Sequence, residues 1–383
     1  MKDRISKKGI AYFTNIAPHY RDCLWRKLAS EYDFEFHFFF GKTSQSGIKE
    51  INFESPDWEP YQNRIHNLKN FRIKGFIVWQ KGVIREVFNK YWDTFIFLGD
   101  MLILSTWVSV IIARILRKPV FFWGHGLYGD ETHIKLFFRR LFLSLADKHF
   151  LYNNRSKFLM VKAGFVESKL YVVYNSLNYD EHLQLRNSLV GSEFNSFKSF
   201  FKQSNHPVLI FIGRLIPDKK LELLIQAVNE LNAQKYYTNL IIIGDGPMLS
   251  VLKNHSESVD GAVYFYGPCY DEKEIGRLIS NASLCVSPGS VGLTSIHSLS
   301  FGTPIISHSN FSKQMPEFEA IEDRVTGAFF EENNVESLKI VIRDWLQNHP
   351  TKDAVIKNAC YAKVDMYYNP YYQVSIFKLA LNQ

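Results

Sequence analysis

The chain has 383 residues, too many for a single hydrophobic core, which stops growing near roughly 250 to 300 residues, so the length predicts two domains. Its composition, 46% hydrophobic and 22% charged, is typical of globular proteins. Its four cysteines are widely spaced and include no Cys-x-x-Cys pair, so neither a zinc site nor a disulfide framework is indicated. The net charge of +7 consists of +9 over residues 1–185 and −2 over the rest, which indicates an anionic surface or ligand facing the first half.

Neither a leader nor a membrane anchor is expected. The first residues, MKDRISKKGIAYF, are basic but have no apolar run long enough for a signal peptide. The most apolar stretch, 95–123, is broken by Asp100 and by a basic group at 114–118, so it is too short for a span of about 20 residues. We expect strand, helix and strand there, and a cytoplasmic protein because the cysteines suit a reducing compartment.

In the first half of the chain, short β-rich runs alternate with amphipathic helical segments. This alternation predicts a parallel sheet covered by helices on both faces, that is, a Rossmann-like domain over residues 1–185. The polar, weakly periodic stretch 186–206 is interpreted as a linker. The predicted strands are 9–14, 34–40, 94–99, 119–124, 148–153 and 170–175.

The same alternation resumes after the predicted linker and predicts a second doubly wound domain over residues 207–365. Residues 366–383 are expected to form a C-terminal helix that packs back onto the first domain. Because open sheets of this kind bind ligands beyond the carboxyl ends of their strands, two such domains predict a central cleft. The strands expected in this half are 207–213, 239–246, 263–267, 284–288 and 304–308.

Two loops follow buried strands of the second domain. GRLIPDKK places Arg214 and Lys219 just after the strand 207–213, where a planar fork and a point charge suit a diphosphate. The alternative is that both are ordinary solvated loop residues, and their spacing favours the diphosphate. In IIIGDGPM, a glycine-rich turn is expected to start a helix at Pro247, with Asp245 as its cap.

A third loop lies in SPGSVGLTSIHSLSFGTPII, residues 287–306. A strand is expected to end at Ser287, and a helix begins near Leu293 or Thr294 after a glycine-rich turn. Unpaired N–H groups at a helix N-terminus carry about half a positive charge, so this turn suits a phosphate. No Asp or Glu occurs from Ser287 to Ser312, so the turn contains no carboxylate to hold sugar hydroxyls.

Taken together, GRLIPDKK, IIGDGP and SPGSVGLTSIHSLSFGTPII resemble, in order and spacing, the donor domain of retaining glycosyltransferases of family 4, which have the GT-B fold. The resemblance covers residues 207–330 well and the first half weakly. It implies a nucleotide-diphosphate-sugar donor, no cofactor, no metal, and transfer with retention of anomeric configuration. It also implies that Arg214 and Lys219 bind the donor diphosphate.

The chain departs from the family pattern at two positions. The family has two Glu separated by seven residues, one for the donor sugar and one for the ribose hydroxyls, and the matching positions here are Gly289 and His297. Backbone N–H groups of the turn are therefore expected to contact the donor instead. The expected donor site consists of Gly213, Arg214, Lys219, Gly244, Gly289, Ser290, Val291, Gly292, Leu293, Thr294, His297 and Glu317.

Two of these residues have a second interpretation. His297 either hydrogen-bonds a ribose hydroxyl or is a helix histidine that points into a domain interface. Glu317, in a Pro-Glu step that resembles a later loop of the family, either contacts the donor or is an acid favoured at the start of a helix.

In the first half, His125 stands between two glycines directly after the strand 119–124. The glycines permit close approach, and the residue resembles the family histidine that reaches the donor sugar, although a lone histidine is otherwise structural. We therefore group His125 with Arg214 and Lys219 as catalytic residues. The residues expected to bind the acceptor are His19, Tyr20, Arg21 and Asp130, with helix capping as the other interpretation for Asp130 and Glu131.

Residues 134–145, IKLFFRRLFLSL, form a basic and aromatic helical pattern. Such a helix either lies on an anionic bilayer or covers a sheet with a solvated basic edge, and the charge of the first half favours the bilayer. Peripheral contact with the inner face of the cell membrane is therefore expected.

The function that these patterns predict is transfer of a sugar from a nucleotide-diphosphate-sugar to a glycan or lipid-linked acceptor, as in bacterial-type surface polysaccharide biosynthesis. Two alternatives stay open. The missing carboxylates suit a non-catalytic GT-B protein that binds a glycan or partners an active transferase, and a GT-B sugar-nucleotide epimerase is the less favoured enzyme. Nucleic acid is not expected as a partner, because it explains the charge and none of the motifs.

Overall fold

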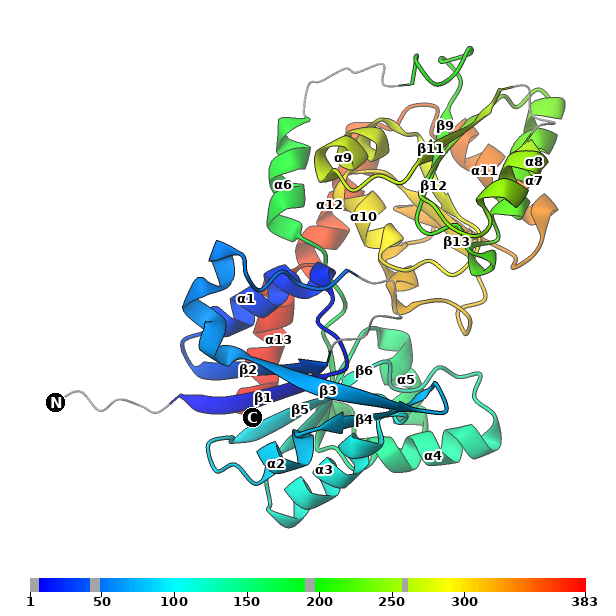
Figure 1. Cartoon of the computed structure of the whole chain (residues 1–383). Helices are drawn as coiled ribbons and strands as arrows, with labels where there is room; N and C mark the ends of the chain where they lie inside the picture. The colour runs from blue at the N-terminus through cyan, green and yellow to red at the C-terminus, as the bar shows by residue number, and fades with distance from the viewer. Residues whose placement is uncertain (1–6, 42–48, 190–196, 257–260) are drawn as a thin grey trace. The chain divides into compact units, whose positions relative to one another are not determined.

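The computed structural model describes residues 7–41, 49–189, 197–256 and 261–383 (Figure 1). The chain divides into two compact units. Unit 1 consists of Met1–Asn178 and Pro370–Gln383, and unit 2 consists of Tyr179–Asn369. Each unit is an α/β domain built around its own sheet, so the predicted fold class is confirmed.

The sheet of unit 1 has eight strands in the order β4-β3-β2-β1-β5-β6-β7-β8. Only the pair β3 and β4 is antiparallel among the described strand pairs of this sheet, and this edge hairpin was not predicted because its first strand is largely exposed and polar. The other six strands were predicted from their apolar runs. The bounds are β1 Lys8–Thr14, β2 Phe34–Gly41, β3 Ile65–Ile73, β4 Ile77–Lys81, β5 Thr94–Leu98, β6 Val120–Gly124, β7 Lys148–Leu151 and β8 Leu170–Val172.

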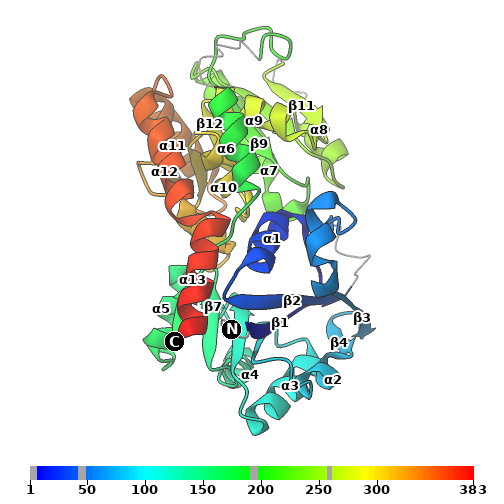
Figure 2. The same ribbon diagram turned by 90° about the vertical axis from the view of Figure 1, so that its left-hand side faces the viewer.

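Helices cover both faces of this sheet. On one face, α1 and the C-terminal helix α13 lie side by side, and Trp25 and Phe377 belong to the core beneath them (Figure 2). On the other face, a second core contains Phe122 and Phe142 under the helices α3, α4 and α5. The bounds are α1 Asp22–Ser30, α2 Val83–Val87, α3 Leu104–Ile115, α4 His133–Leu143, α5 Asn154–Lys162 and α13 Pro370–Asn382, with short 3₁₀ helices η1 His19–Arg21, η2 Pro56–Arg64 and η3 Glu167–Lys169.

The apolar stretch 95–123 forms β5, α3 and β6, as predicted. Within the described ranges, no helix combines the length and the apolar character that crossing a bilayer requires.

Unit 2 contains a parallel sheet of six strands in the order β11-β10-β9-β12-β13-β14. Helices α7, α8 and α11 share the core on one face, and α10 packs with α12. The short last strand β14 was not predicted. The bounds are β9 Val208–Ile212, β10 Asn239–Ile243, β11 Val263–Gly267, β12 Leu284–Ser287, β13 Ile305–His308 and β14 Gly327–Phe330, with α6 Tyr179–Ser188, α7 Leu221–Ala233, α8 Leu249–Ser256, α9 Glu272–Asn281, α10 Thr294–Ser300, α11 Val335–Asn348, α12 Ala354–Tyr367, η4 Pro217–Lys219 and η5 Pro316–Ala320.

The units divide at positions other than those predicted. Helix α6 packs on α9 and α10, so unit 2 begins at Tyr179 and the predicted boundary between 185 and 186 falls inside a helix. Of the predicted linker 186–206, residues 190–196 lie outside the described residues. The predicted C-terminal segment 366–383 is also divided, because α12 ends in unit 2 and α13 belongs to unit 1, where Gln373 accepts a hydrogen bond from Ser176 at 2.6 Å.

Candidate functional site

The loops after β9 and β10 are joined by backbone hydrogen bonds at the carboxyl end of the sheet in unit 2. The N–H of Gly213 donates to Ile243 at 3.0 Å, and a Cβ at Gly244 would overlap the carbonyl oxygen of Gly213. The two expected glycines therefore permit a close approach of neighbouring strand ends. Helix α8 begins at Leu249 and not at the predicted Pro247. Asp245 accepts from the N–H of Gly246 within the turn.

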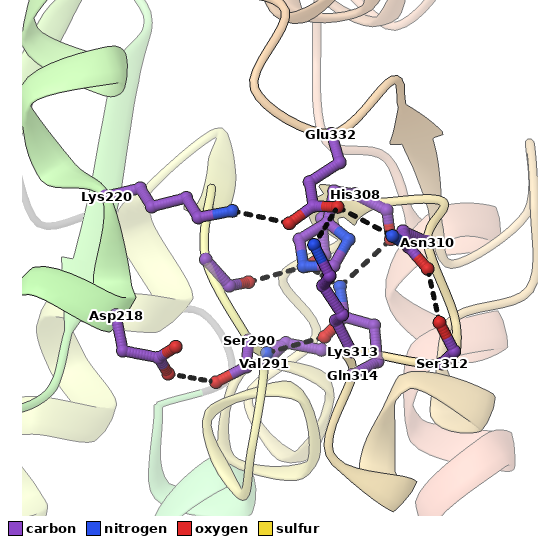
Figure 3. Close-up of polar contacts among 12 residues, drawn as sticks. Asp218, Lys220, Ser290, Val291, His308, Asn310, Ser312, Lys313, Gln314 and Glu332 are labelled. Atoms are coloured by element: carbon purple, nitrogen blue, oxygen red, sulfur yellow. Dashed lines mark hydrogen bonds and ion pairs between the residues drawn. The ribbon is translucent and has the colours of Figure 1, made fainter. Parts of the chain in front are cut away.

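Lys219 joins the loop after β9 to the loop after β12. Its Nζ donates to the carbonyl oxygen of Ser290 at 2.6 Å, while its own carbonyl accepts from the N–H of Gly289 at 3.1 Å. Asp218 adds a further bond by accepting from the Ser290 hydroxyl at 2.5 Å (Figure 3). Burial lowers the pKa of Lys219, and the nearby carboxylates of Asp218 and Glu317 oppose this shift. Two motifs that are distant in sequence thus form one loop cluster.

Gly289 has a steric reason to lack a side chain. A Cβ at this position would overlap the carbonyl oxygen of Asp218 and would lie 2.7 Å from the Cα of Lys219. Both obstacles are backbone atoms, so they cannot be relieved by a rotamer change. The position that carries a Glu in the family pattern is therefore closed to any side chain in this fold.

The sequence predicts that the amide N–H groups of the turn point to open space. In the structure, not all of them do. Val291 donates its N–H to Oε1 of Gln314 at 2.7 Å, and Gln314 in turn donates to Ser307 and to the carbonyl of His308, both at 2.9 Å (Figure 3). The N–H of Val291 is therefore occupied. By contrast, the amide groups of Ser290, Gly292 and Leu293 make no hydrogen bond to the described part of the chain. These three donors remain for a ligand.

A second polar cluster, which was not predicted from the sequence, lies beside this turn. Glu332 accepts from Lys220 and from Asn310, each at 2.7 Å, and Lys313 lies 3.5 Å from it (Figure 3). The hydrogen bond from Lys220 is the main cause that lowers the pKa of Glu332 to about 2. Lys220 itself has a left-handed backbone, with φ at 51°. The cluster fixes η4 against the loops after β13 and β14.

The remaining predicted donor residues lie near the same turn. Arg214 is exposed and makes no ion pair with the described residues. The hydroxyl of Thr294 donates to the carbonyl of Ile212 at 3.1 Å. Glu317 is buried in the first turn of η5, accepts from the Ser295 hydroxyl at its carbonyl, and interacts electrostatically with Lys219. Both interpretations of Glu317 therefore agree with its position.

His297 has a protein partner in place of an open ribose site. Its Nε2 lies 3.0 Å from Oε2 of Glu272, and Nε2 of His182 lies 3.2 Å from the same oxygen. Burial favours the neutral acid, but the hydrogen bonds from the two histidines outweigh it and hold the pKa of Glu272 well below its usual range. The partners of His297 come from α6 and α9 of its own unit, so these contacts are internal to unit 2.

The ligand atoms of His182, Glu272 and His297 all lie within 4.8 Å of one another, a spacing compatible with a metal ion. The two imidazole rings, however, are stacked with centroids 5.0 Å apart and an interplanar angle of 8°. Hydrogen bonds to Glu272 account for the geometry without a metal.

We expect Glu272→Ala to lower the free energy of unfolding of the protein by about 1 to 3 kcal/mol, because the buried His182 and the half-buried His297 lose the acceptor that their imidazole N–H groups share. Urea denaturation at neutral pH measures the change. Asp323→Ala, which removes an exposed carboxylate from the same unit, serves as the control and is expected to shift it by less than about 0.5 kcal/mol. Equal stability of the two variants would show that the cluster contributes nothing.

His125 lies in unit 1 directly after β6. Its ring packs edge-on against Tyr152, with centroids 4.9 Å apart, and its Nδ1 has no hydrogen-bond partner among the described residues. Burial, together with the positive charges of Arg21 and Arg139, lowers its pKa to about 4. His125 is therefore a neutral imidazole at pH 7 with one buried nitrogen available.

Arg21 differs from its prediction as an acceptor-binding residue. Its side chain is buried, donates to the hydroxyls of Tyr12 and Tyr152, and stacks on Trp123 with the guanidinium carbon 4.3 Å from the ring centroid. It holds Tyr152, which packs against His125, and does not face solvent, because its planar guanidinium fits between aromatic rings.

The other expected acceptor residues, His19 and Asp130, are exposed, and Tyr20 is half-buried. Neither Asp130 nor Glu131 caps α4, because Thr132 is the N-cap residue and accepts from the N–H of Lys135. Glu131 instead accepts from the N–H groups of Tyr128 and Gly129.

We expect the protein to lose stability as the pH falls from about 6.5 to about 4, because His125 and His149 are buried and neutral. Burial is the main cause that lowers their pKa values, to about 4 and about 3. The unfolded chain binds their protons first, so each contributes a slope of about 1.4 kcal/mol per pH unit in this window and none above it. Urea denaturation of wild type and His149→Met across this range measures the slope.

Exposed His255 provides the control, since His255→Gln is expected to leave that slope unchanged. A His149→Met variant with the wild-type pH dependence would contradict the assignment of a neutral, buried imidazole.

The chain has two α/β units with parallel sheets and a loop cluster at the carboxyl ends of β9, β12 and β13. This architecture matches the class of GT-B proteins. Residues 192–360 match the family described as glycosyl transferases group 1. The match includes η4, the turn 287–293 and η5.

Solved structures of GT-B proteins resemble the whole chain. Anabaena Alr3699/HepE in complex with UDP has a TM-score of 0.67 and 16% identity, covering 98% of this chain and 100% of that one. The lipopolysaccharide outer core galactosyltransferase WaaB in its apo form has a TM-score of 0.68 and 15% identity, covering 97% of this chain and 99% of that one. At these identities the likeness shows the fold.

Curated relatives match over shorter stretches. The uncharacterized glycosyltransferase MJ1607 of Methanocaldococcus jannaschii is 24% identical over 209 residues, covering 52% of this chain and 50% of that protein. The glycogen synthase of Francisella tularensis is 28% identical over 144 residues, covering 34% of this chain and 28% of that enzyme. The chain therefore spans half or less of the length of these relatives.

Proposed function

We propose that the protein transfers a sugar from a nucleotide-diphosphate-sugar to a glycan or lipid-linked acceptor, with retention of anomeric configuration, in the assembly of a surface polysaccharide. The main support for this proposal is the loop cluster in the second unit. In it, Lys219 contacts the turn, Gly289 has no room for a side chain, and amide N–H groups of the turn lack a partner in the described part of the chain. Cationic and N–H donors suit a diphosphate, and the Asp218 carboxylate beside them is already engaged by the Ser290 hydroxyl.

Two comparisons support this proposal. The stretch that matches the group 1 family includes every residue of the cluster. The HepE structures hold UDP and UDP-glucose, and WaaB is named a galactosyltransferase of the lipopolysaccharide outer core. A nucleotide sugar is thus the donor class, and a surface glycan the acceptor class, that we propose for this chain.

In the proposed mechanism, the bond between the anomeric carbon and the diphosphate oxygen breaks while the acceptor hydroxyl attacks from the same face. Arg214, Lys219 and the N–H groups of Gly292 and Leu293 stabilise the negative charge that develops on the departing diphosphate. His125 donates or accepts a hydrogen bond at a sugar hydroxyl through its available nitrogen. The departing phosphate oxygen takes the proton of the acceptor hydroxyl, so no side chain of the cluster needs to act as a nucleophile.

Isothermal titration calorimetry tests the donor class. Nucleoside diphosphates with uracil, guanine, thymine and adenine bases are titrated alongside the matching monophosphates. We expect at least one diphosphate to bind roughly tenfold or more tightly than its monophosphate, since the second phosphate is the group that Lys219 contacts. Equal affinities for every pair would contradict the proposed site.

A further inference from the structure

Helix α4 has an apolar stripe on its outer side as well as on its inner side. Ile134, Phe137, Phe138 and Leu141 recur at intervals of three and four residues and are all exposed, Ile134 by 74% and Phe137 by 63%. The side that faces the sheet is formed by Phe142 and Leu143, which are buried. The outer stripe is therefore largely open to solvent in the described part of unit 1.

Helix α3 repeats this arrangement. Leu104, Val108, Ile111 and Ile115 lie along its exposed side, Ile115 by 75%, whereas Ser105 and Ser109 are fully buried against the sheet. In a helix that only covers a sheet, apolar residues face the core and polar residues face water. Here the apolar side chains extend to the outside.

The outward stripes form one surface, because α3, α4 and α5 are joined to each other. Trp107 of α3 packs on Phe142 of α4, with ring centroids 4.9 Å apart. Arg140 of α4 donates to the carbonyl of Ala163, directly after α5, at 2.8 Å. Phe158 on α5 is also exposed. We call this surface, made of the outer sides of α3, α4 and α5, the outer helical face.

A groove of about 710 Å³ continues the outer helical face between α4 and residues 163–170, which follow α5. Its walls combine Phe137, Leu141 and Val166 with the cations Arg140 and Lys169. Apolar walls with basic groups at the same opening match the chemistry of a phospholipid, an acyl chain joined to a phosphate.

The charge around this face is strongly positive. Residues 104–170 contain eleven Lys or Arg and four Asp or Glu, a net charge of +7. Two of those acids are paired at the surface, Asp147 with Arg114 at 3.6 Å and Glu167 with Lys157 at 3.1 Å. A second copy of this chain would present the same positive charge and be repelled, whereas an anionic surface would be attracted.

We propose that the outer helical face docks on an anionic phospholipid bilayer. The apolar stripes of α3 and α4 enter the boundary between headgroups and acyl chains, and the surrounding Lys and Arg side chains contact lipid phosphates. This inference rests on unit 1 alone and does not depend on the activity proposed for the chain.

Co-sedimentation of the full-length protein with vesicles tests the docking. Vesicles of phosphatidylcholine alone are compared with vesicles that also contain phosphatidylglycerol, at low and at high salt. We expect at least tenfold stronger binding to the anionic vesicles, weakened by salt. Equal binding to both compositions, or no binding to either, would overturn the proposal.

Two double variants separate the apolar and the basic contributions. Ile134→Ser/Phe137→Ser and Lys135→Glu/Lys162→Glu are each expected to lower the affinity for anionic vesicles roughly tenfold or more. Val355→Ser/Met366→Ser and Lys253→Glu/Arg324→Glu, which change exposed residues of unit 2, are the matched controls and are expected to bind like wild type. Far-UV circular dichroism with a thermal melt establishes that each variant is folded.

Analytical ultracentrifugation of the same variants tests a different occupant. A dimer that Ile134→Ser/Phe137→Ser dissociates, found together with unchanged vesicle binding by that variant, would assign the face to a second copy and overturn the bilayer proposal.

Discussion

Lys219→Ala is expected to keep its fold and to lose roughly 10²- to 10³-fold in kcat/KM for the nucleotide-sugar donor. In the structure, one hydrogen-bond donor of the Lys219 ammonium is used by the carbonyl of Ser290, and its other N–H donors can reach a ligand. Partial burial reduces the screening of its charge by water, so its interaction with a diphosphate is stronger than that of an exposed lysine. Steady-state kinetics with the preferred donor measure the loss.

The control for Lys219 is Lys253→Ala, which removes an exposed lysine from α8 of the same unit. We expect this variant to have wild-type kinetics, and both variants to unfold within about 1 kcal/mol of wild type, since Lys219→Ala leaves one carbonyl without its donor. Undiminished donor turnover by a folded Lys219→Ala protein would exclude the assignment of Lys219 to the diphosphate.

Gly289→Glu, which introduces the acid of the family pattern, is expected to inactivate the protein and to lower its free energy of unfolding by about 3 kcal/mol or more. Any side chain at this position starts with a Cβ that overlaps the carbonyl of Asp218 and crowds the Cα of Lys219. The loop after β9 has to move, and this breaks the hydrogen bond from the N–H of Gly289 to the carbonyl of Lys219. Thermal melts and donor-binding calorimetry measure both effects.

Gly289→Ala separates the steric effect from that of the added charge. Because the clash begins at Cβ, alanine is expected to produce most of the destabilisation. Gly292→Ala is the matched control, since a Cβ there meets no atom within 4 Å. A Gly289→Glu protein that is stable and more active than wild type would show that the loop accepts the family acid and would refute the steric explanation.

The buried strands were predictable from local sequence, whereas one edge of each sheet, β3 and β4 in unit 1 and β14 in unit 2, was not. Runs such as VLIFI in β9 and NLIII in β10 are continuous and apolar because both faces of the sheet are covered. Strand β3 lies next to the edge strand β4 and has the polar sequence IHNLKNFRI, which has neither a continuous apolar run nor clear alternation. Its pairing is set by tertiary contacts that periodicity does not report.

The sequence located the candidate site but did not reveal its partners. Lys219, Gly289 and the turn were found because each motif directly follows a buried strand. Glu272 and Gln314 were missed because their contacts, with His297 and with the N–H of Val291, join separate elements and have no fixed spacing.

Arg21 shows the same limit of sequence analysis. The position of Arg21 after β1 was predicted. The tyrosine hydroxyls that accept hydrogen bonds from its guanidinium come from β1 and from the residue after β7. Only the folded chain shows that this cation is buried.

The central claim, that this chain breaks a nucleotide-sugar bond, is tested most directly by measuring nucleotide release from a panel of UDP-, GDP-, dTDP- and CMP-sugars in hydrolysis and transfer assays. We predict turnover of at least one nucleotide-diphosphate-sugar by wild type, reduced roughly 100-fold or more in Lys219→Ala. Tight nucleotide binding without turnover of any sugar would contradict the claim and would identify the protein as a non-catalytic member of the GT-B class.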